Sequence, residues 1–386
     1  MNFFLKKYSI VSSPCLCGLL LVLVYTCVVR SASAADSGPA PRPDVLVFSN
    51  GDRLTGQMER VANGKVYFKS GAVGELQVPW NKIKDLRAKG PFAVISTRTR
   101  VHRGRPNPQV PQGSIHMLDQ QLSVQDASGK QTVPVKDVPF VVDVSTYRTA
   151  VQRTPGLLHD WTGTVTGGAS TVTSTQNETT YNSGIALTRT VPSVAWMPAS
   201  YRTLLGFTSS YGKITQPGTP TVKTNIFHAS AEQDKYFSPR FYMLGQSVFD
   251  HNFAQGLDLQ QLYGGGLGLT VIKAAKQELD LDASMDYTKQ QFQVASSNLN
   301  LVGSTIGDTY FYKFPHGIEV TEASAIMPQW NVMDAYSANA NIGLAMPVFK
   351  KLAFSIQIID SYLNNPPTGF KGNSLQFNTG LTYTLP

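Results

Sequence analysis

The stretch QELDLDASMDY, residues 277–287, decides the fold expected for this chain. Apolar side chains hold one set of alternate positions, and polar or acidic side chains hold the other: Leu279, Leu281, Ala283, Met285 and Tyr287 against Glu278, Asp280, Asp282, Ser284 and Asp286. Successive side chains of a β-strand point to opposite faces, so the stretch predicts a strand with one apolar and one acidic face. A half-buried strand of a soluble sheet fits this pattern, and so does the wall of a membrane barrel with lipid outside and water inside.

Alternating runs of the same kind, separated by turn-forming residues, fill the region from residue 156 to residue 386. Apolar side chains share one face in the runs 201–211, 227–231, 257–271, 336–346, 352–358 and 375–385. Tyrosines mark the ends of several of these faces, as in the aromatic girdles of membrane barrels. The pattern predicts a transmembrane antiparallel β-barrel of about 12 strands, an even number as bacterial barrels have. A soluble antiparallel barrel or sandwich is the alternative.

The connections between the runs alternate in length. YFSPRF, KAAKQ, FPHG and VFKK are tight, whereas TQPGTPTVK, SSNLN and NNPPTGFKGN are longer and polar. Short turns at the periplasmic end and longer loops at the outer end of a barrel give this rhythm.

Residues 1–35 are predicted to be a cleaved signal peptide for export through the inner membrane. Lys6 and Lys7 precede an apolar run, and SASAAD supplies small residues for an A-x-A cleavage site. All three cysteines, Cys15, Cys17 and Cys27, lie in this segment. The mature chain would therefore have no disulfide, no thiol nucleophile and no cysteine metal ligand.

Residues 36–152 differ from the barrel region in charge. The chain carries a net charge of +8, and counting by region places +7 on residues 36–155 and −2 on residues 156–386. Residues 56–83 are similar to residues 113–138, with VPWNKI in the first copy matching VPVKDV in the second. The repeat and its Asn-Gly turns predict a basic periplasmic β domain, a small β-roll or barrel made of two similar units.

An arginine-rich and proline-rich loop lies between the two units. Arg98, Arg100, Arg103 and Arg105 are its candidate contacts for an anionic envelope polymer or a periplasmic protein. A solvated basic loop is the plainer interpretation. No nucleic-acid-binding motif accompanies the charges, so we expect no nucleic acid as a partner.

The polar faces of the barrel strands supply the lumen-facing candidates, which could tune ion selectivity or be solvated wall residues: His228, Glu232, Asp234, Asp258, Glu278, Asp280, Asp282 and Asp286. No residue is proposed as catalytic, and no metal site or cofactor is expected. The glycines of YGGGLGLT precede no helix, so they predict curvature or close packing inside a barrel rather than phosphate binding. Asp250 and His251 are neighbours in a strand and point to opposite faces, which argues against a catalytic pair.

Two blocks carry a resemblance to a known family. Residues 237–272, FSPRFYMLGQSVFDHNFAQGLDLQQLYGGGLGLTVI, and residues 362–386, YLNNPPTGFKGNSLQFNTGLTYTLP, resemble the YdiY-like salt-induced outer-membrane proteins, a domain of unknown function. The resemblance implies an outer-membrane β-barrel without an established enzyme activity. Its partners would be outer-membrane lipids and the barrel assembly machinery.

The sequence thus predicts an outer-membrane β-barrel protein of the bacterial envelope, with a structural or stress-related role or a narrow pore. An outer-membrane lipid-modifying hydrolase and a soluble periplasmic β-sandwich binding protein are the alternative functions.

Overall fold

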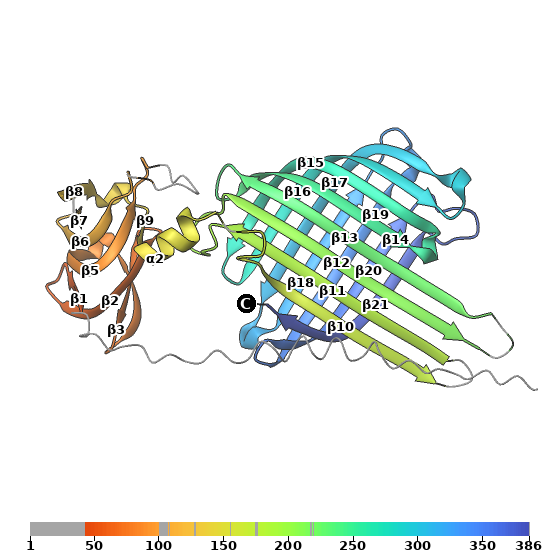
Figure 1. The fold of residues 1–386 in the computed structure, drawn as a ribbon, viewed down its shortest axis with the longest axis horizontal. Coiled ribbons are helices and arrows are strands. Elements are labelled where there is room, and N and C mark those ends of the chain that lie inside the picture. Colours follow the sequence, from red (N-terminus) through yellow and green to blue (C-terminus); the bar gives the residue numbers. More distant parts are fainter. Residues whose placement is uncertain are drawn as a thin grey trace, which may run out of the picture. The chain divides into compact units, whose positions relative to one another are not determined.

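The structure is a computed structural model that describes residues 43–99, 107, 109–126, 129–154, 156–173, 177–216, 218 and 220–385. It has two β-rich parts, an amino-terminal sheet and a carboxy-terminal barrel (Figure 1). The predicted signal peptide lies outside the described residues.

The amino-terminal part is a nine-stranded antiparallel sheet in the order β4-β3-β2-β1-β5-β6-β7-β8. The strand β9 pairs with both β2 and β5, so β2, β1, β5 and β9 form a closed circuit. The bounds are β1 (Asp44–Phe48), β2 (Arg53–Ala62), β3 (Lys65–Ser70), β4 (Gly74–Pro79), β5 (Ile83–Ile95), β6 (Gln112–Leu118), β7 (Gln121–Asp126), β8 (Gly129–Pro134) and β9 (Phe140–Asp143).

The two similar sequence segments form matching units. In each unit three strands connected by tight turns end at a proline, Pro79 or Pro134, and a 3₁₀ turn follows: η1 (Trp80–Lys82) or η2 (Val135–Asp137). The first turn of each unit contains a residue with positive φ, Asn63 in one and Asp119 in the other. Short polar residues of this type adopt that conformation at low cost, which explains the turn.

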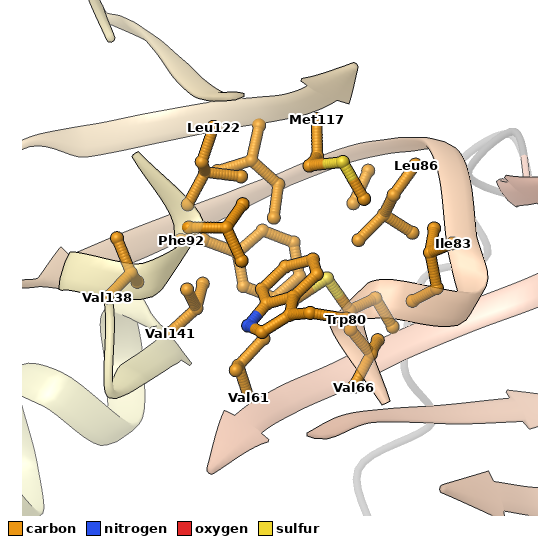
Figure 2. Close-up of a cluster of buried hydrophobic side chains, with 14 of the residues drawn as sticks. Val61, Val66, Trp80, Ile83, Leu86, Phe92, Met117, Leu122, Val138 and Val141 are labelled. Carbon is orange, nitrogen blue, oxygen red and sulfur yellow. The ribbon is translucent and has the colours of Figure 1, made fainter. Parts of the chain in front are cut away.

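A single apolar core joins the two units. Trp80 is surrounded by side chains from both units, including Val66, Met117 and Leu122 (Figure 2). The helices α2 (Val144–Thr146) and η3 (Tyr147–Gln152) follow β9 and lead to the barrel segment of the chain.

The carboxy-terminal part is a closed barrel of the twelve strands β10 to β21, each antiparallel to the next, with β21 pairing back onto β10 (Figure 1). The prediction of a β-barrel of about 12 strands is confirmed. The bounds are β10 (Thr162–Thr173), β11 (Asn177–Val191), β12 (Tyr201–Thr215), β13 (Val222–Tyr236), β14 (Phe241–Asn252), β15 (Leu257–Ala274), β16 (Gln277–Phe292), β17 (Leu299–Lys313), β18 (Glu319–Met327), β19 (Ser337–Phe349), β20 (Leu352–Leu363) and β21 (Asn373–Thr384).

The barrel has two rims, because consecutive strands run in opposite directions. We call the end where β10 begins the turn rim, and its connections are residues 192–200, 237–240, 275–276, 314–318 and 350–351. The other end is the loop rim, whose connections include residues 253–256, 293–298, 328–336 and 364–372. All four connections predicted to be tight lie at the turn rim.

The opening stretch lies in β16 and alternates as predicted. Leu281, Met285 and Tyr287 are exposed on the outer face, whereas Asp280 and Asp286 are buried inside, with 3% and 6% of their surface exposed. The cross-strand partners extend this outer apolar face, since Tyr287 pairs with Tyr263 and Leu281 pairs with Leu269. A closed barrel leaves no edge strand unpaired, which is the condition for a sheet to lie in hydrocarbon.

The predicted outward orientation of Leu257, the first residue of β15, is wrong. Leu257 was expected to share the outer face of residues 257–271, but a register shift between Leu257 and Leu259 turns its side chain inward. It is buried in a small cluster with Phe292 of β16 and Leu363 of β20. A β-bulge adds a residue to one strand and so inverts the alternation on one side of it.

None of the described helices has the length and apolarity that a membrane span requires.

Candidate functional site: the barrel lumen

Most of the predicted lumen residues lie on the inner faces of β13 and β16, two strands that β14 and β15 separate. On β13, the outward-facing Phe227 and Ala229 alternate with the inward-facing His228, Glu232 and Asp234. On β16, outward-facing apolar residues alternate with the inward-facing Glu278, Asp280, Asp282 and Asp286. Asp258 is the exception: it lies at the register shift of β15 and is exposed, apart from the others.

Arg202 of β12 joins the two acidic strands near the turn rim. Its Nε donates to Asp234 Oδ2 at 2.6 Å, and its NH1 group donates to Asp280 Oδ2 at 2.6 Å. Glu278 lies farther away, with its Oε1 at 3.7 Å from the same NH1 nitrogen. The side chain of Asp234 is fully buried, and that of Asp280 is 4% exposed. Sequence reasoning did not single out Arg202, although it is the cation that compensates both buried carboxylates.

Two further hydrogen-bond chains cross the same wall. Gln246 of β14 donates to Ser284 Oγ of β16 at 2.9 Å, and Ser284 donates to Asp286 Oδ1 at 2.7 Å. Closer to the loop rim, Gln290 donates to Gln260 Oε1 at 2.8 Å, and Gln260 donates to Asp250 Oδ2 at 3.0 Å. The inner faces of β12 to β16 therefore form one cross-linked polar wall.

Three glycines of β15 leave room for these hydrogen-bonded side chains to cross the inner face of that strand. A Cβ atom at Gly268 would lie 2.2 Å from the Tyr242 ring, and one at Gly264 would lie 1.8 Å from Asp286 Oδ1. Gly266 pairs with Ser284 and sits beneath the Gln246–Ser284 bond. The prediction that these glycines permit close packing inside a barrel is confirmed.

We expect Gly266→Ala to destabilise the barrel by about 1–3 kcal/mol, the usual cost of overpacking. The new Cβ would lie 2.0 Å from the backbone oxygen of Ala283, which cannot move without the strand. Gly265→Ala is the matched control, because its Cβ faces outward with the nearest atom at 3.7 Å. Urea titration of the folded barrel measures both changes, and equal midpoints for the two variants would contradict the packing account.

The other side of the lumen is open. A cavity of about 1120 Å³ lies inside the barrel, and residues from all twelve strands line it. It extends from Lys350 at the turn rim to Gln255 at the loop rim.

The inner faces of β19, β20 and β21 carry no charged side chain along their described length. With β11 they present six amide side chains to the cavity: Asn182, Asn339, Asn341, Gln357, Gln376 and Asn378. We call this surface the amide wall. The lumen thus has a cross-linked, charged side and an open, uncharged side.

A short segment of the chain crosses the lumen at the loop rim. Gln255 belongs to η4 (Phe253–Gln255), between β14 and β15, and its Nε2 donates to Ser361 O at 2.9 Å and to Gly372 O at 2.7 Å. In a ring of twelve strands β14 and β15 stand opposite β20 and β21, so these bonds span the mouth. Gly256 has a φ of +67° and lies against the ring of Phe370, a position where a larger residue would clash.

Asp250 contacts His228, a pairing that the sequence analysis did not predict. Its Oδ1 lies 2.7 Å from His228 Nδ1, since these two residues pair across β13 and β14. His251 points outward, where its Nδ1 contacts Asp258 O and its ring stacks on Phe227. Within the described residues no serine hydroxyl bonds to His228.

Of the four arginines predicted to contact an anionic partner, the structure describes Arg98 alone. Its side chain is 86% exposed, with one nitrogen 3.7 Å from Asp137 Oδ2. Arg100, Arg103 and Arg105 lie outside the described residues, so their role stays a prediction. In the part of the chain that the structure describes, no three His, Cys, Asp or Glu side chains are grouped to hold a metal ion.

Comparison with known proteins identifies a family for the barrel. A family model described as "Protein of unknown function, DUF481" matches residues 165–385. The search of curated proteins found no match.

Solved structures with a similar arrangement include three outer-membrane or autotransporter barrels. The COG4313 outer membrane channel from Pseudomonas putida F1 is 10% identical with a TM-score of 0.35, covering 60% of this chain and 100% of that one. The NanC porin is 9% identical with a TM-score of 0.34, covering 58% and 100%. The beta domain of the Bordetella autotransporter BrkA is 10% identical with a TM-score of 0.29, covering 58% and 98%.

Proposed function

Since the chain belongs to the DUF481 family, whose function is unknown, we propose a function from its own geometry: a narrow outer-membrane channel with a gated outer mouth. The observation that carries this proposal is the cavity of about 1120 Å³ inside a closed barrel whose outer face exposes many large apolar side chains. A barrel with lipid outside and a polar interior is the architecture that conducts solutes through outer membranes.

The outer face supports the membrane location. Its exposed apolar side chains include Leu267, Leu269, Met285, Ile306 and Ile326, from the adjoining strands β15 to β18. Soluble monomers rarely expose a contiguous apolar surface of this extent. In this proposal the basic amino-terminal domain lies in the periplasm, because the chain enters the barrel at the turn rim, and short turns face the periplasm in bacterial barrels.

The width of the lumen supports a narrow channel rather than a wide one. The cross-linked wall of β12 to β16 fills part of the interior with side chains, and η4 crosses the loop rim. Barrels of modest strand number hold side chains or one small ligand inside, whereas 16–18-stranded porins leave a wide aqueous channel.

Planar-bilayer recording of the purified full chain tests the proposal. We expect small, discrete conductance steps from the wild type. Gln255→Ala removes the two bonds across the mouth and should raise the conductance or the open fraction severalfold. Phe253→Ala is the control, because Phe253 is exposed in the same turn and should leave both quantities unchanged. A folded barrel that never conducts, with or without Gln255, would disprove the channel.

A further inference from the structure

We infer that the amide wall is a binding surface for an uncharged, polyhydroxylated solute, an oligosaccharide of about the size that the cavity admits. This inference rests on the proposed function, since it names the class of solute that would pass or bind in the same lumen.

The first step is the position of charge on the side of the lumen opposite the amide wall, where Arg202, Glu278 and Asp280 line the cavity. Asp234, Asp280 and Asp286 are buried, and one oxygen of each accepts a hydrogen bond from Arg202 or Ser284 within the wall of β12 to β16. Lys313, Lys350 and Glu319 lie at the turn rim, at the entrance. A charged solute bound against β19 to β21 would lose hydration without meeting an opposite charge on that wall, which is costly.

The second step is the continuity of the amide wall. Gln357 pairs with Asn378 across β20 and β21, and its Nε2 donates to Asn341 Oδ1 of β19 at 3.1 Å. Gly168 of β10 has no side chain, which leaves room for the side chain of Asn182 to extend over it. Asn182 Nδ2 donates to Thr379 O of β21 at 3.3 Å. The surface therefore runs unbroken from β19 across the closing seam of the barrel to β11.

The third step is the hydrogen-bonding capacity left on this wall. Within the described residues, Asn339, Gln376 and Asn378 make no side-chain hydrogen bond, and all three line the cavity. Each amide offers two donor hydrogens and an acceptor oxygen. A sugar hydroxyl likewise donates and accepts, so a row of amides and hydroxyls such as Thr166 and Ser355 matches the edge of a sugar chain.

Three trisaccharide-length probes test the charge preference: maltotriose, which is uncharged, trigalacturonate, which is anionic, and the glucosamine trimer, which is cationic. The readouts are block of the bilayer current and calorimetric binding to the detergent-solubilised full chain. We expect maltotriose to bind at least tenfold more tightly than either charged trimer. Equal binding of the three, or preference for a charged one, would overturn the inference.

Variants locate the binding surface. Gln357→Leu combined with Asn378→Leu should weaken maltotriose binding at least fivefold. Gln357→Glu, which keeps the shape, should weaken it and favour the glucosamine trimer. Phe377→Leu is the control, because Phe377 is exposed on the outer face between the lumen positions Gln376 and Asn378 and its replacement should change nothing. Unchanged maltotriose binding in a folded Gln357→Glu barrel would overturn the assignment of the site.

Failure of this inference is distinguishable from failure of the channel. Ion conductance that none of the three trimers alters would overturn the binding surface and leave the channel standing. Calorimetric binding of maltotriose by a barrel that carries no current would overturn the channel and support the binding surface.

Discussion

Arg202→Met should lower the free energy of unfolding of the barrel by about 3–5 kcal/mol, the cost of leaving buried charges without their partner. The change keeps most of the side-chain volume and removes the charge that meets Asp234 and Asp280, both at 2.6 Å. The measurement is urea titration in detergent, monitored by the mobility difference between folded and boiled barrel on a gel.

Two companion variants make this result specific. Arg240→Met removes an exposed arginine at the same rim and should cost less than about 0.5 kcal/mol. Adding Asp234→Asn and Asp280→Asn to Arg202→Met should restore part of the loss, because the two buried carboxylates are then uncharged. If Arg202→Met unfolds at the same urea concentration as Arg240→Met, the ion-pair account is wrong.

Ile358→Arg should cost about 2–4 kcal/mol if its side chain lies near the middle of the bilayer. Ile358 is 40% exposed on the outer face of β20, between the cavity-lining residues Gln357 and Ile359. Gln357→Arg places the same charge one position away but inside the lumen, where water reaches it. We expect this second variant to assemble with a far smaller loss, measured in lipid vesicles by urea titration.

If Gln357→Arg costs more stability than Ile358→Arg, the face that carries Ile358 does not lie in lipid. A soluble sheet with a buried inner face would tolerate arginine at Ile358, on its solvated side, and lose stability at Gln357. The pair of variants therefore separates a membrane barrel from a soluble one without reference to any ligand.

The fold could be predicted from sequence because its main determinant is local. Alternation within residues 277–287 is visible in a single strand, and each further strand repeats it. Leu257 shows the limit of this reasoning, since one register shift inverted its face, and no residue in the run marks the bulge.

The arrangement inside the lumen could be predicted only in part. The inward orientation of Asp234 and Asp280 follows from alternation, but their meeting at Arg202 depends on register across β12 to β16 and on ring closure. His228 and Asp250 meet for the same reason, through a cross-strand pair that no spacing in the sequence encodes. Polar residues at alternate positions in residues 337–345 and 374–382 were the one sequence feature that pointed to the amide wall. Neutral polar side chains on a strand do not by themselves indicate a binding surface.

Site-directed fluorescence along β20 tests the central claim most directly. Single cysteines at Ser355, Ile356, Gln357 and Ile358, in a background without Cys15, Cys17 and Cys27, carry a bimane label, and the full chain is reconstituted in vesicles with brominated lipid. The account predicts strong quenching at Ile356 and Ile358 and little at Ser355 and Gln357. Uniform quenching, no quenching, or quenching at the two inner positions alone would contradict a barrel with lipid outside and water within.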